Sequence, residues 1–362
     1  MIQSKIVNGV KTFISDDYNY KFNMDSGYFE RWGKTEDDDP QYSPYGPEII
    51  DLELSSGQCR GNCPFCYKGN TPNLPIEYMD FDTYKKLFKI INVPTLTQIA
   101  FGITDIDANP DFWDIIEFTA NNDIIPNYTT NGIGITKDIA DKTRLFCGAV
   151  AVSVYMHNKE KAYNAIKMYI DAGMTQVNIH FMLSTETMDF AYDVMHDIQT
   201  DDRLKGMNAI VFLQYKDKNP QAHFTSPNFL QFKSLIDCCL DMNVKFGFDS
   251  CSSAMFMKAV ADRDDADKLI QYVDNCESFG LFSGYISYQG IFYPCSFAEG
   301  VGEWKEGINI FKIEDFVKDI WYSDKLSRNR YQSSHSSDKC ICKFSGVCRT
   351  CLIYSELSRC IN

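Results

Sequence analysis

The sequence contains no apolar run that approaches the roughly 20 residues of a membrane-spanning helix. Residues 1–13 also lack the apolar segment of a secretory signal peptide. Positive charge is in deficit, because 49 acidic side chains outnumber 35 basic ones and the net charge is −14. Nucleic-acid-binding proteins usually carry a basic surface. We therefore expect a cytoplasmic protein with no membrane segment and no nucleic-acid partner.

Apolar and aromatic residues are plentiful, at 44% and 14% of the chain. This composition predicts a packed globular protein, and the length of 362 residues indicates two or three domains. The 14 cysteines are the most informative residues. In a cytoplasmic chain they indicate metal or redox sites rather than disulfide bonds.

Three of the cysteines, Cys59, Cys63 and Cys66, share one loop that follows the apolar run 48–55. Three thiolates at these spacings can bind three irons of a four-iron, four-sulfur cluster, whereas ordinary clusters take four. One iron would then be open to a small-molecule ligand. A zinc site is the alternative, but structural zinc takes four ligands, and no fourth cysteine or histidine lies nearby in the sequence.

The spacing C-x3-C-x2-C, with Phe65 just before the third cysteine, resembles the radical S-adenosylmethionine (SAM) superfamily. The resemblance implies that SAM binds the open iron and that its reductive cleavage gives a 5′-deoxyadenosyl radical, which abstracts hydrogen from a substrate. It implies an external one-electron reductant of the flavodoxin or ferredoxin type. It also implies that Phe65 and Tyr67, which flank the third cysteine, contact the cofactor.

From residue 48 onward, strand-like and helix-like segments alternate. Strand-like runs begin near residues 48, 96, 124, 149, 176 and 208, and amphipathic stretches cover 81–91, 111–119, 159–171, 185–198 and 228–242. Repeated strand–helix units predict right-handed crossovers and a parallel sheet. We therefore expect an α/β fold, a partial (β/α)6 barrel like the radical SAM core. Its active site is expected at the C-terminal ends of the strands.

Three parts of the chain are expected. Residues 1–47 contain two hairpin patterns and predict a β-rich N-terminal extension, which either covers the core or grips a substrate. Residues 48–250 form the barrel. Residues 251–362 form a small α+β cluster-binding domain, in which the polar stretch 323–339 is expected to be a surface loop.

Polar residues near the expected strand ends are the candidate SAM contacts that the resemblance implies. Ser153, on the fourth strand, is the foremost of them. His180 shares a strand face with Asn178, although a single histidine in a strand is more often a hydrogen-bonded core residue. The full set of candidates is Gly102, Thr104, Thr130, Asn131, Ser153, Asn178 and Gln214.

Eight further cysteines follow residue 250, the number that two fully ligated four-iron clusters require. The remaining three, Cys147, Cys238 and Cys239, are expected to be buried or idle thiols. The spacing of Cys276, Gly290 and Cys295 resembles the opening of a SPASM/twitch domain, C-x(9–15)-G-x4-C.

The closing cysteines resemble the end of that domain, C-x2-C-x5-C-x3-C-xn-C, but depart from it by one residue in two gaps. The resemblance implies a first auxiliary cluster on one set of thiolates and a second on another. A zinc site at the closing cysteines, or one auxiliary cluster only, are the alternatives. The first set is Cys276, Cys295 and Cys351, with Cys251 as fourth ligand; the second is Cys340, Cys342, Cys348 and Cys360.

Enzymes with these motifs commonly oxidise, cross-link or epimerise ribosomally made peptides or proteins, so the resemblance implies a peptide or protein substrate. Two alternatives stay open, namely the same radical chemistry on a small alcohol or sugar, and an electron carrier. Asp249 and Glu299 are the candidate acid–base residues, because cluster cysteines cannot exchange protons in that role. The alternative is that both residues are ordinary surface or helix-capping acids.

Overall fold

The computed structural model describes residues 2–218, 223–336, 338, 344, 348–354 and 357. In this part of the chain the centre is a sheet of order β13-β12-β11-β10-β9-β8-β5-β14-β15-β16. From β5 to β13 neighbouring strands are parallel. They include every strand predicted from residue 48 onward, so the expected α/β fold around a large parallel sheet is confirmed. These strands are β5 (Ile49–Glu53), β8 (Gln98–Gly102), β9 (Ile125–Thr130), β10 (Ala149–Ser153), β11 (Val177–Leu183), β12 (Ala209–Gln214) and β13 (Phe246–Phe248).

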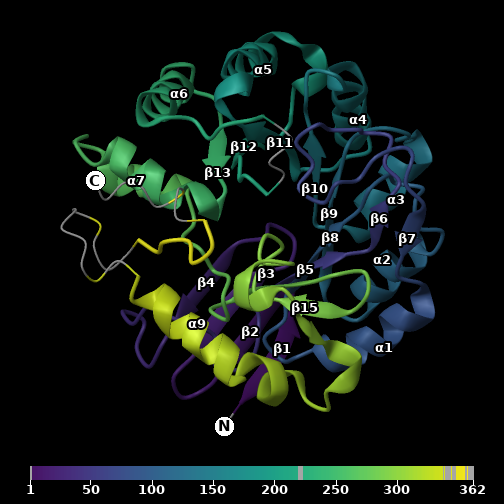
Figure 1. The fold of residues 1–362 in the computed structure, drawn as a ribbon, viewed down its shortest axis with the longest axis vertical. Helices are drawn as coiled ribbons and strands as arrows, with labels where there is room; N and C mark the ends of the chain where they lie inside the picture. Colours follow the sequence, from purple (N-terminus) through teal and green to yellow (C-terminus); the bar gives the residue numbers. More distant parts are fainter. Residues whose placement is uncertain are drawn as a thin grey trace.

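Helices connect the successive parallel strands and lie along the outer side of the arc that the strands form (Figure 1). Each packs through an apolar face; α1, for example, buries Leu87 and Ile91, and the Asp80 carboxylate caps its first turn by accepting a hydrogen bond from Thr83 N. The crossovers bring the C-terminal ends of the strands to one edge of the sheet. The helices are α1 (Phe81–Ile91), α2 (Phe112–Asn121), α3 (Lys137–Phe146), α4 (Lys159–Asp171), α5 (Met188–Thr200) and α6 (Phe229–Asp241).

Helix α3 was not among the helices predicted from the sequence. It buries only Ala140 and Thr143, and half of its ten residues are charged, so few apolar side chains mark it as a core-facing helix. Thr136 caps its first turn by accepting a hydrogen bond from Ile139 N.

The N-terminal segment forms a four-stranded antiparallel sheet of β1 (Gln3–Val7), β2 (Val10–Ile14), β3 (Asn19–Asn23) and β4 (Phe29–Trp32). Asn8 and Gly9 turn between β1 and β2 with φ of 51° and 73°, the left-handed conformation that a tight hairpin turn needs. One face of the sheet buries aromatic residues against Leu281 and Phe282, far along the chain. The N-terminal sheet therefore packs on the C-terminal part.

The C-terminal part continues the central sheet. β14 (Ser283–Ile286) pairs in parallel with β5, and β15 (Ile291–Tyr293) and β16 (Ile308–Asn309) follow antiparallel. Two short helices, α7 (Ser253–Val260) and α8 (Ala266–Leu269), precede them. The sheet thus runs across the boundary predicted at residue 250.

The prediction of a surface loop over 323–339 was wrong, because Asp324–Ser334 forms helix α9. Its buried face is largely polar. Asn329 Oδ1 accepts a hydrogen bond from Trp304 Nε1 over 2.8 Å, and Arg330 Nε donates to Gly280 O over 2.6 Å. Tertiary partners, rather than apolar periodicity, hold this helix in place. Across the described residues, every helix is too short or too polar to cross a bilayer.

Candidate active site

The cysteine loop lies between two short antiparallel strands, β6 (Ser55–Gly57) and β7 (Ile76–Tyr78), directly after β5. Cys59, Cys63 and Cys66 all line one cavity of about 500 Å³. The other walls come mainly from the C-terminal ends of β5 and of β8 to β12. This is the edge at which barrels of parallel strands hold their active sites.

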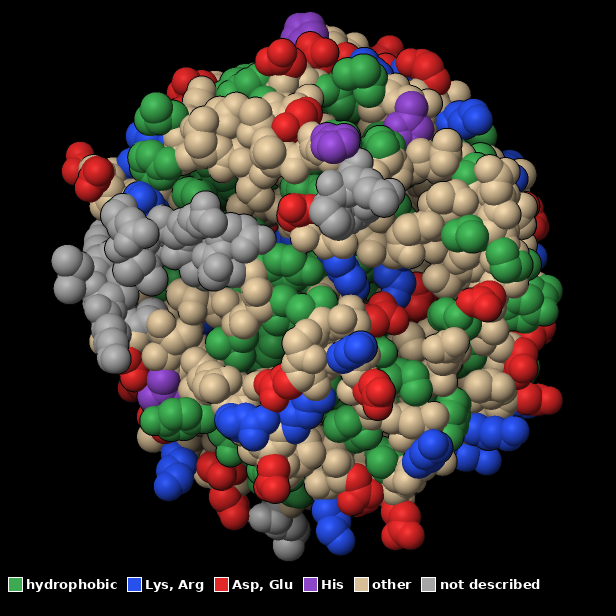
Figure 2. All heavy atoms as spheres, in the orientation of Figure 1, with side chains coloured by type: hydrophobic (Ala, Val, Ile, Leu, Met, Phe, Trp, Pro, Cys, Tyr) green, Lys and Arg blue, Asp and Glu red, His purple; other side chains and the backbone are tan. Residues whose placement is uncertain are grey.

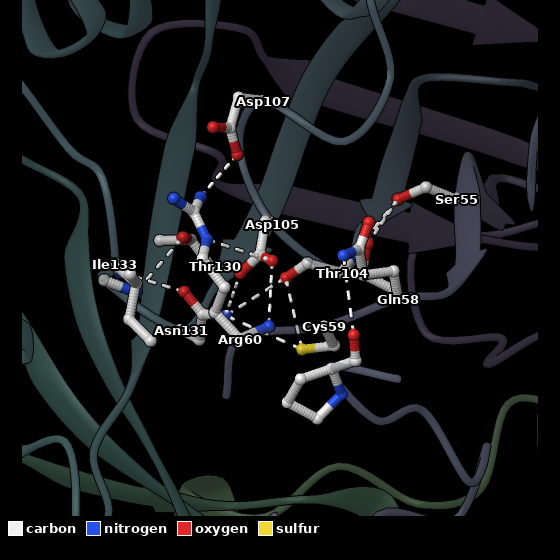
Figure 3. A network of polar contacts seen from close by, with 12 residues as sticks. Ser55, Gln58, Cys59, Arg60, Thr104, Asp105, Asp107, Thr130, Asn131 and Ile133 are labelled. Carbon is white, nitrogen blue, oxygen red and sulfur yellow. Dashed lines mark hydrogen bonds and ion pairs between the residues drawn. The ribbon is translucent and has the colours of Figure 1, made fainter. Parts of the chain in front are cut away.

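The loop is fixed by a network of polar contacts around Asp105 (Figure 3). Oδ2 of Asp105 accepts a hydrogen bond from the backbone N–H of Arg60 over 2.9 Å, and Oδ1 accepts one from Nδ2 of Asn131 over 2.7 Å. Nδ2 of Asn131 also lies 3.7 Å from the sulfur of Cys59 and 3.2 Å from Thr104 O. Asp105, three residues after β8, therefore holds the cysteine loop against the ends of β8 and β9.

The residues around the thiols fit an iron–sulfur cluster with a ligand beside it. Gly61 leaves room between two thiols, because a Cβ there would lie 3.3 Å from Cys59 Sγ and 3.6 Å from Cys63 Sγ. In the same cavity, Oε1 of Gln214 is buried without a hydrogen-bond partner among the described residues. No three His, Cys, Asp or Glu side chains in the described ranges lie close enough to hold a single metal ion together.

Most of the candidate SAM contacts line this same cavity. His180 lines it as well, and burial lowers the pKa of its imidazole to about 4. Asn178 does not line it: its Oδ1 accepts a hydrogen bond from Asn208 Nδ2 over 2.9 Å, near the start of β11. The candidates that line the cavity are Phe65, Tyr67, Gly102, Thr104, Thr130, Asn131, Ser153 and Gln214.

Four cysteines from distant parts of the C-terminal region line a second, smaller cavity of about 140 Å³. Cys251 follows β13, Cys276 precedes β14, Cys295 follows β15, and Cys351 lies near the end of the described chain. Burial raises the pKa of Cys276 to about 11 and that of Cys295 to about 12.

Of the second predicted set of cluster ligands, only one cysteine is described. Cys348 is buried and does not line the four-cysteine cavity. Cys340, Cys342 and Cys360 lie outside the described residues. The second ligand set therefore stays a prediction.

The two cavities adjoin, because they share lining residues. Among these, Lys216 Nζ lies 2.7 Å from Asp249 Oδ2. Burial alone would lower the pKa of Lys216, but the carboxylate of Asp249 and the Cys251 thiolate offset this effect and raise it. The shared residues are Asp51, Lys216, Asp249, Ser296 and Phe297.

Charged side chains of both signs lie next to one another near the middle of the face shown in Figure 2. Beside the larger cavity, Lys68 Nζ lies 3.1 Å from Glu53 Oε2 and 2.8 Å from the hydroxyl of Tyr285, and it also pairs with Glu299. Glu299 itself is not among the described residues that line either cavity. Both predicted acid–base residues, Asp249 and Glu299, are thus engaged by a lysine.

Asp51 is a functional candidate that the sequence analysis missed. It lies on β5, lines both cavities, and has no hydrogen-bond or ion-pair partner among the described residues. Its side chain is exposed to the cavity but surrounded by protein, and burial raises its pKa from 3.8 to about 6. The signal in the sequence was the alternation Ile50-Asp51-Leu52-Glu53, which puts two acids on one face of a buried strand.

No protein-family model and no curated protein matches this chain. Several solved structures match it. Streptococcus suis SuiB bound to precursor peptide SuiA is 14% identical, with a TM-score of 0.63 over 85% of this chain and 72% of that one. SuiB bound to S-adenosylmethionine is 14% identical, with a TM-score of 0.61 over 85% and 71%. Native anSMEcpe with bound AdoMet and Cp18Cys peptide is 15% identical, with a TM-score of 0.59 over 83% and 88%.

The chain has the fold of radical SAM enzymes. The radical SAM resemblance that was drawn from Cys59, Cys63 and Cys66 is therefore confirmed at the level of the fold. The individual cluster ligands and SAM contacts stay predictions.

Proposed function

We propose that this protein is a radical SAM enzyme that modifies a ribosomally made peptide or protein. The chemistry that SAM and a four-iron cluster would supply here, with one electron from an external reductant, is a 5′-deoxyadenosyl radical. It would abstract hydrogen from a substrate side chain for oxidation, cross-linking or epimerisation. The observation that carries the proposal is the single cavity lined by Cys59, Cys63, Cys66 and most of the candidate SAM contacts.

Cys59, Cys63 and Cys66 would hold the radical cluster, and SAM would lie between it and the ends of β8 to β12. In this arrangement Gln214 offers an unpaired acceptor, and Thr104, Thr130, Asn131 and Ser153 offer further polar groups. The neutral imidazole of His180 would carry no charge that repels the SAM sulfonium. We propose that the core is the partial (β/α)6 barrel, over residues 48–250.

The four thiols of Cys251, Cys276, Cys295 and Cys351 would hold an auxiliary four-iron cluster, whose usual ligands are four thiolates. Residues 251–362 would thus form a SPASM-like part. Cys340, Cys342, Cys348 and Cys360 would hold a second auxiliary cluster.

We propose that the substrate side chain meets the protein where the two cavities adjoin. Asp51 would be the proton acceptor there, because it faces this space without a partner, and a base works best when its pKa approaches the working pH. Asp249 and Glu299 are less suited as bases, since each is paired with a lysine. A peptide substrate is supported by the neighbours solved with peptides, and residues 1–47 would cover the core.

The test is anaerobic reconstitution followed by incubation with SAM and dithionite. The wild type is expected to bind about twelve irons per chain and to release 5′-deoxyadenosine. Replacing Cys59, Cys63 and Cys66 together by Ala should abolish this product, whereas Cys238→Ala, on α6 and away from both cavities, should not. Continued SAM cleavage by the triple variant would refute the proposal. Cleavage that small alcohols stimulate and peptides do not would favour a small-molecule substrate.

A further inference from the structure

Lys216 is a buried cation at the junction of the two cavities. It lies two residues after β12, and its side chain is 4% exposed. It lines both the larger cavity, which holds Cys59, Cys63 and Cys66, and the smaller four-cysteine cavity. Its ammonium lies 4.5 Å from the centre of the Phe297 ring. Few lysines are buried to this degree without a specific partner.

The partner is Asp249, whose carboxylate is itself held in place. Asp249 Oδ1 accepts hydrogen bonds from Ser252 Oγ over 2.6 Å and from Gln214 N over 3.3 Å, while Oδ2 faces Lys216 at 2.7 Å. These contacts therefore fix the positions of the Lys216 ammonium and the Asp249 carboxylate at the wall of the four-cysteine cavity.

Both charges act on Cys251. Lys216, Asp249 and Cys251 line the same small cavity, and Cys251 follows Asp249 by two residues, so both charges face the space that the four thiols enclose. The reduced form of an iron–sulfur cluster carries one more negative charge than the oxidised form, so a nearby cation stabilises it and a nearby anion destabilises it. The cavity holds only about 140 Å³ and the Lys216 side chain is 4% exposed, so salt and bulk solvent screen the effect only weakly.

We propose that the Lys216–Asp249 pair sets the reduction potential of the cluster held by Cys251, Cys276, Cys295 and Cys351, with Lys216 raising the potential and Asp249 lowering it. This inference rests on the auxiliary cluster of the proposed function. It assigns Lys216 a tuning role at the point where the substrate would meet the auxiliary cluster. A higher potential makes that cluster a better acceptor of an electron from the substrate.

The experiment is an anaerobic redox titration of the reconstituted full-length protein, followed by electron paramagnetic resonance. The parent background replaces Cys59, Cys63 and Cys66 by Ala, which removes the radical cluster, and also Cys340, Cys342 and Cys360, which removes the second proposed auxiliary cluster. The signal of the cluster held by the four-cysteine cavity is then observed alone. In this background, Lys216→Met should shift the midpoint potential to more negative values and Asp249→Asn to more positive values. The double variant should lie between them, and Lys216→Arg, which keeps the charge, should stay near the parent.

Lys11→Met is the matched control, because Lys11 is also buried but lines neither cavity. It should leave the midpoint unchanged. If the parent shows an auxiliary signal and all variants share its midpoint, this inference falls and the proposed function stands. If the parent binds no iron, the auxiliary cluster of the proposed function is refuted, and this inference with it. A shift of the same sign in Lys216→Met and Asp249→Asn would indicate a structural effect and would also overturn the inference.

Discussion

The backbone N–H of Arg60 donates a hydrogen bond to Asp105 across 2.9 Å, which joins the cysteine loop to the end of β8. The other oxygen of that carboxylate binds Asn131, at the end of β9. Asp105 is 6% exposed, so water does not replace either contact when it is lost. The geometry of the loop thus depends on a residue that is not a cysteine.

We expect Asp105→Ala to loosen the cysteine loop. The free energy of unfolding should fall by about 1–3 kcal/mol for each buried group that is left unpaired, and 5′-deoxyadenosine formation should fall with it. Asp107→Ala is the control: Asp107 pairs at an exposed position with the Arg60 side chain, whose Nε also lies 3.2 Å from Asp105 Oδ2. It should cost about 0–1 kcal/mol. Equal effects of the two variants in chemical denaturation would contradict this role of Asp105.

Arg31 connects the N-terminal sheet to two other parts of the chain. Its Nη2 lies 2.7 Å from Glu48, just before β5, and 2.9 Å from Glu277, before β14. Its guanidinium also lies 3.9 Å from the centre of the Phe282 ring. Glu48 is 3% exposed, so removing Arg31 would leave a buried carboxylate without its cation.

We therefore expect Arg31→Ala to lower the free energy of unfolding by about 3–5 kcal/mol, the usual cost of breaking a buried ion pair from one side. Urea denaturation measures the change. Arg328→Ala removes an ion pair with Glu303 at the surface and should cost about 0–1 kcal/mol. If Arg31→Gln, which keeps part of the hydrogen bonding, were as stable as the wild type, charge pairing would not be the cause.

Asp51 should make stability depend on pH. Burial raises its pKa from 3.8 to about 6, so the folded state holds the proton more tightly than the unfolded state does. Its contribution to stability is therefore complete below about pH 4 and is lost as the pH rises through about 6. The advantage of Asp51→Asn over the wild type should grow across this window and then stay level.

Denaturation at a series of pH values measures that difference. Asn121→Ser, at an exposed position of α2, is the control because it changes no titratable group, and its difference from the wild type should stay flat over the same range. A flat difference for Asp51→Asn as well would show that its carboxyl is solvated normally.

The regular part of the fold could be predicted from the sequence, because its strands and most helices bury continuous or periodic apolar faces. Helices α3 and α9 could not be predicted, because neither buries such a face. α3 buries only two small side chains. α9 buries Asn329 and Arg330, which bind Trp304 and Gly280 in other segments of the chain. A pattern of hydrophobic residues does not record such partners.

The site shows the same division. The triad follows from spacing within one loop, whereas the convergence of Cys251, Cys276, Cys295 and Cys351 depends on β14 joining β5. Asp51 was missed because it is distinguished by having no hydrogen-bond or ion-pair partner among the described residues, which the sequence does not show. An acid in a strand is ordinary until the structure shows that the nearby Lys216 pairs with Asp249, and that Asp51 lines both cavities without an ion pair among the described residues.

The two cavities predict that the radical cluster and the first auxiliary cluster assemble independently. Cys276→Ala/Cys295→Ala removes two thiols of the smaller cavity and none of the larger, so iron should fall by about four per chain. Reductive cleavage of SAM should continue, because Cys59, Cys63 and Cys66 are untouched. Cys147→Ala/Cys238→Ala is the matched control, since neither residue lines either of these two cavities, and its iron content should equal that of the wild type. Unchanged iron in the first variant would mean that the four thiols hold no cluster. Loss of all iron would mean that the larger site needs the smaller one to form, which the separate sets of lining thiols argue against.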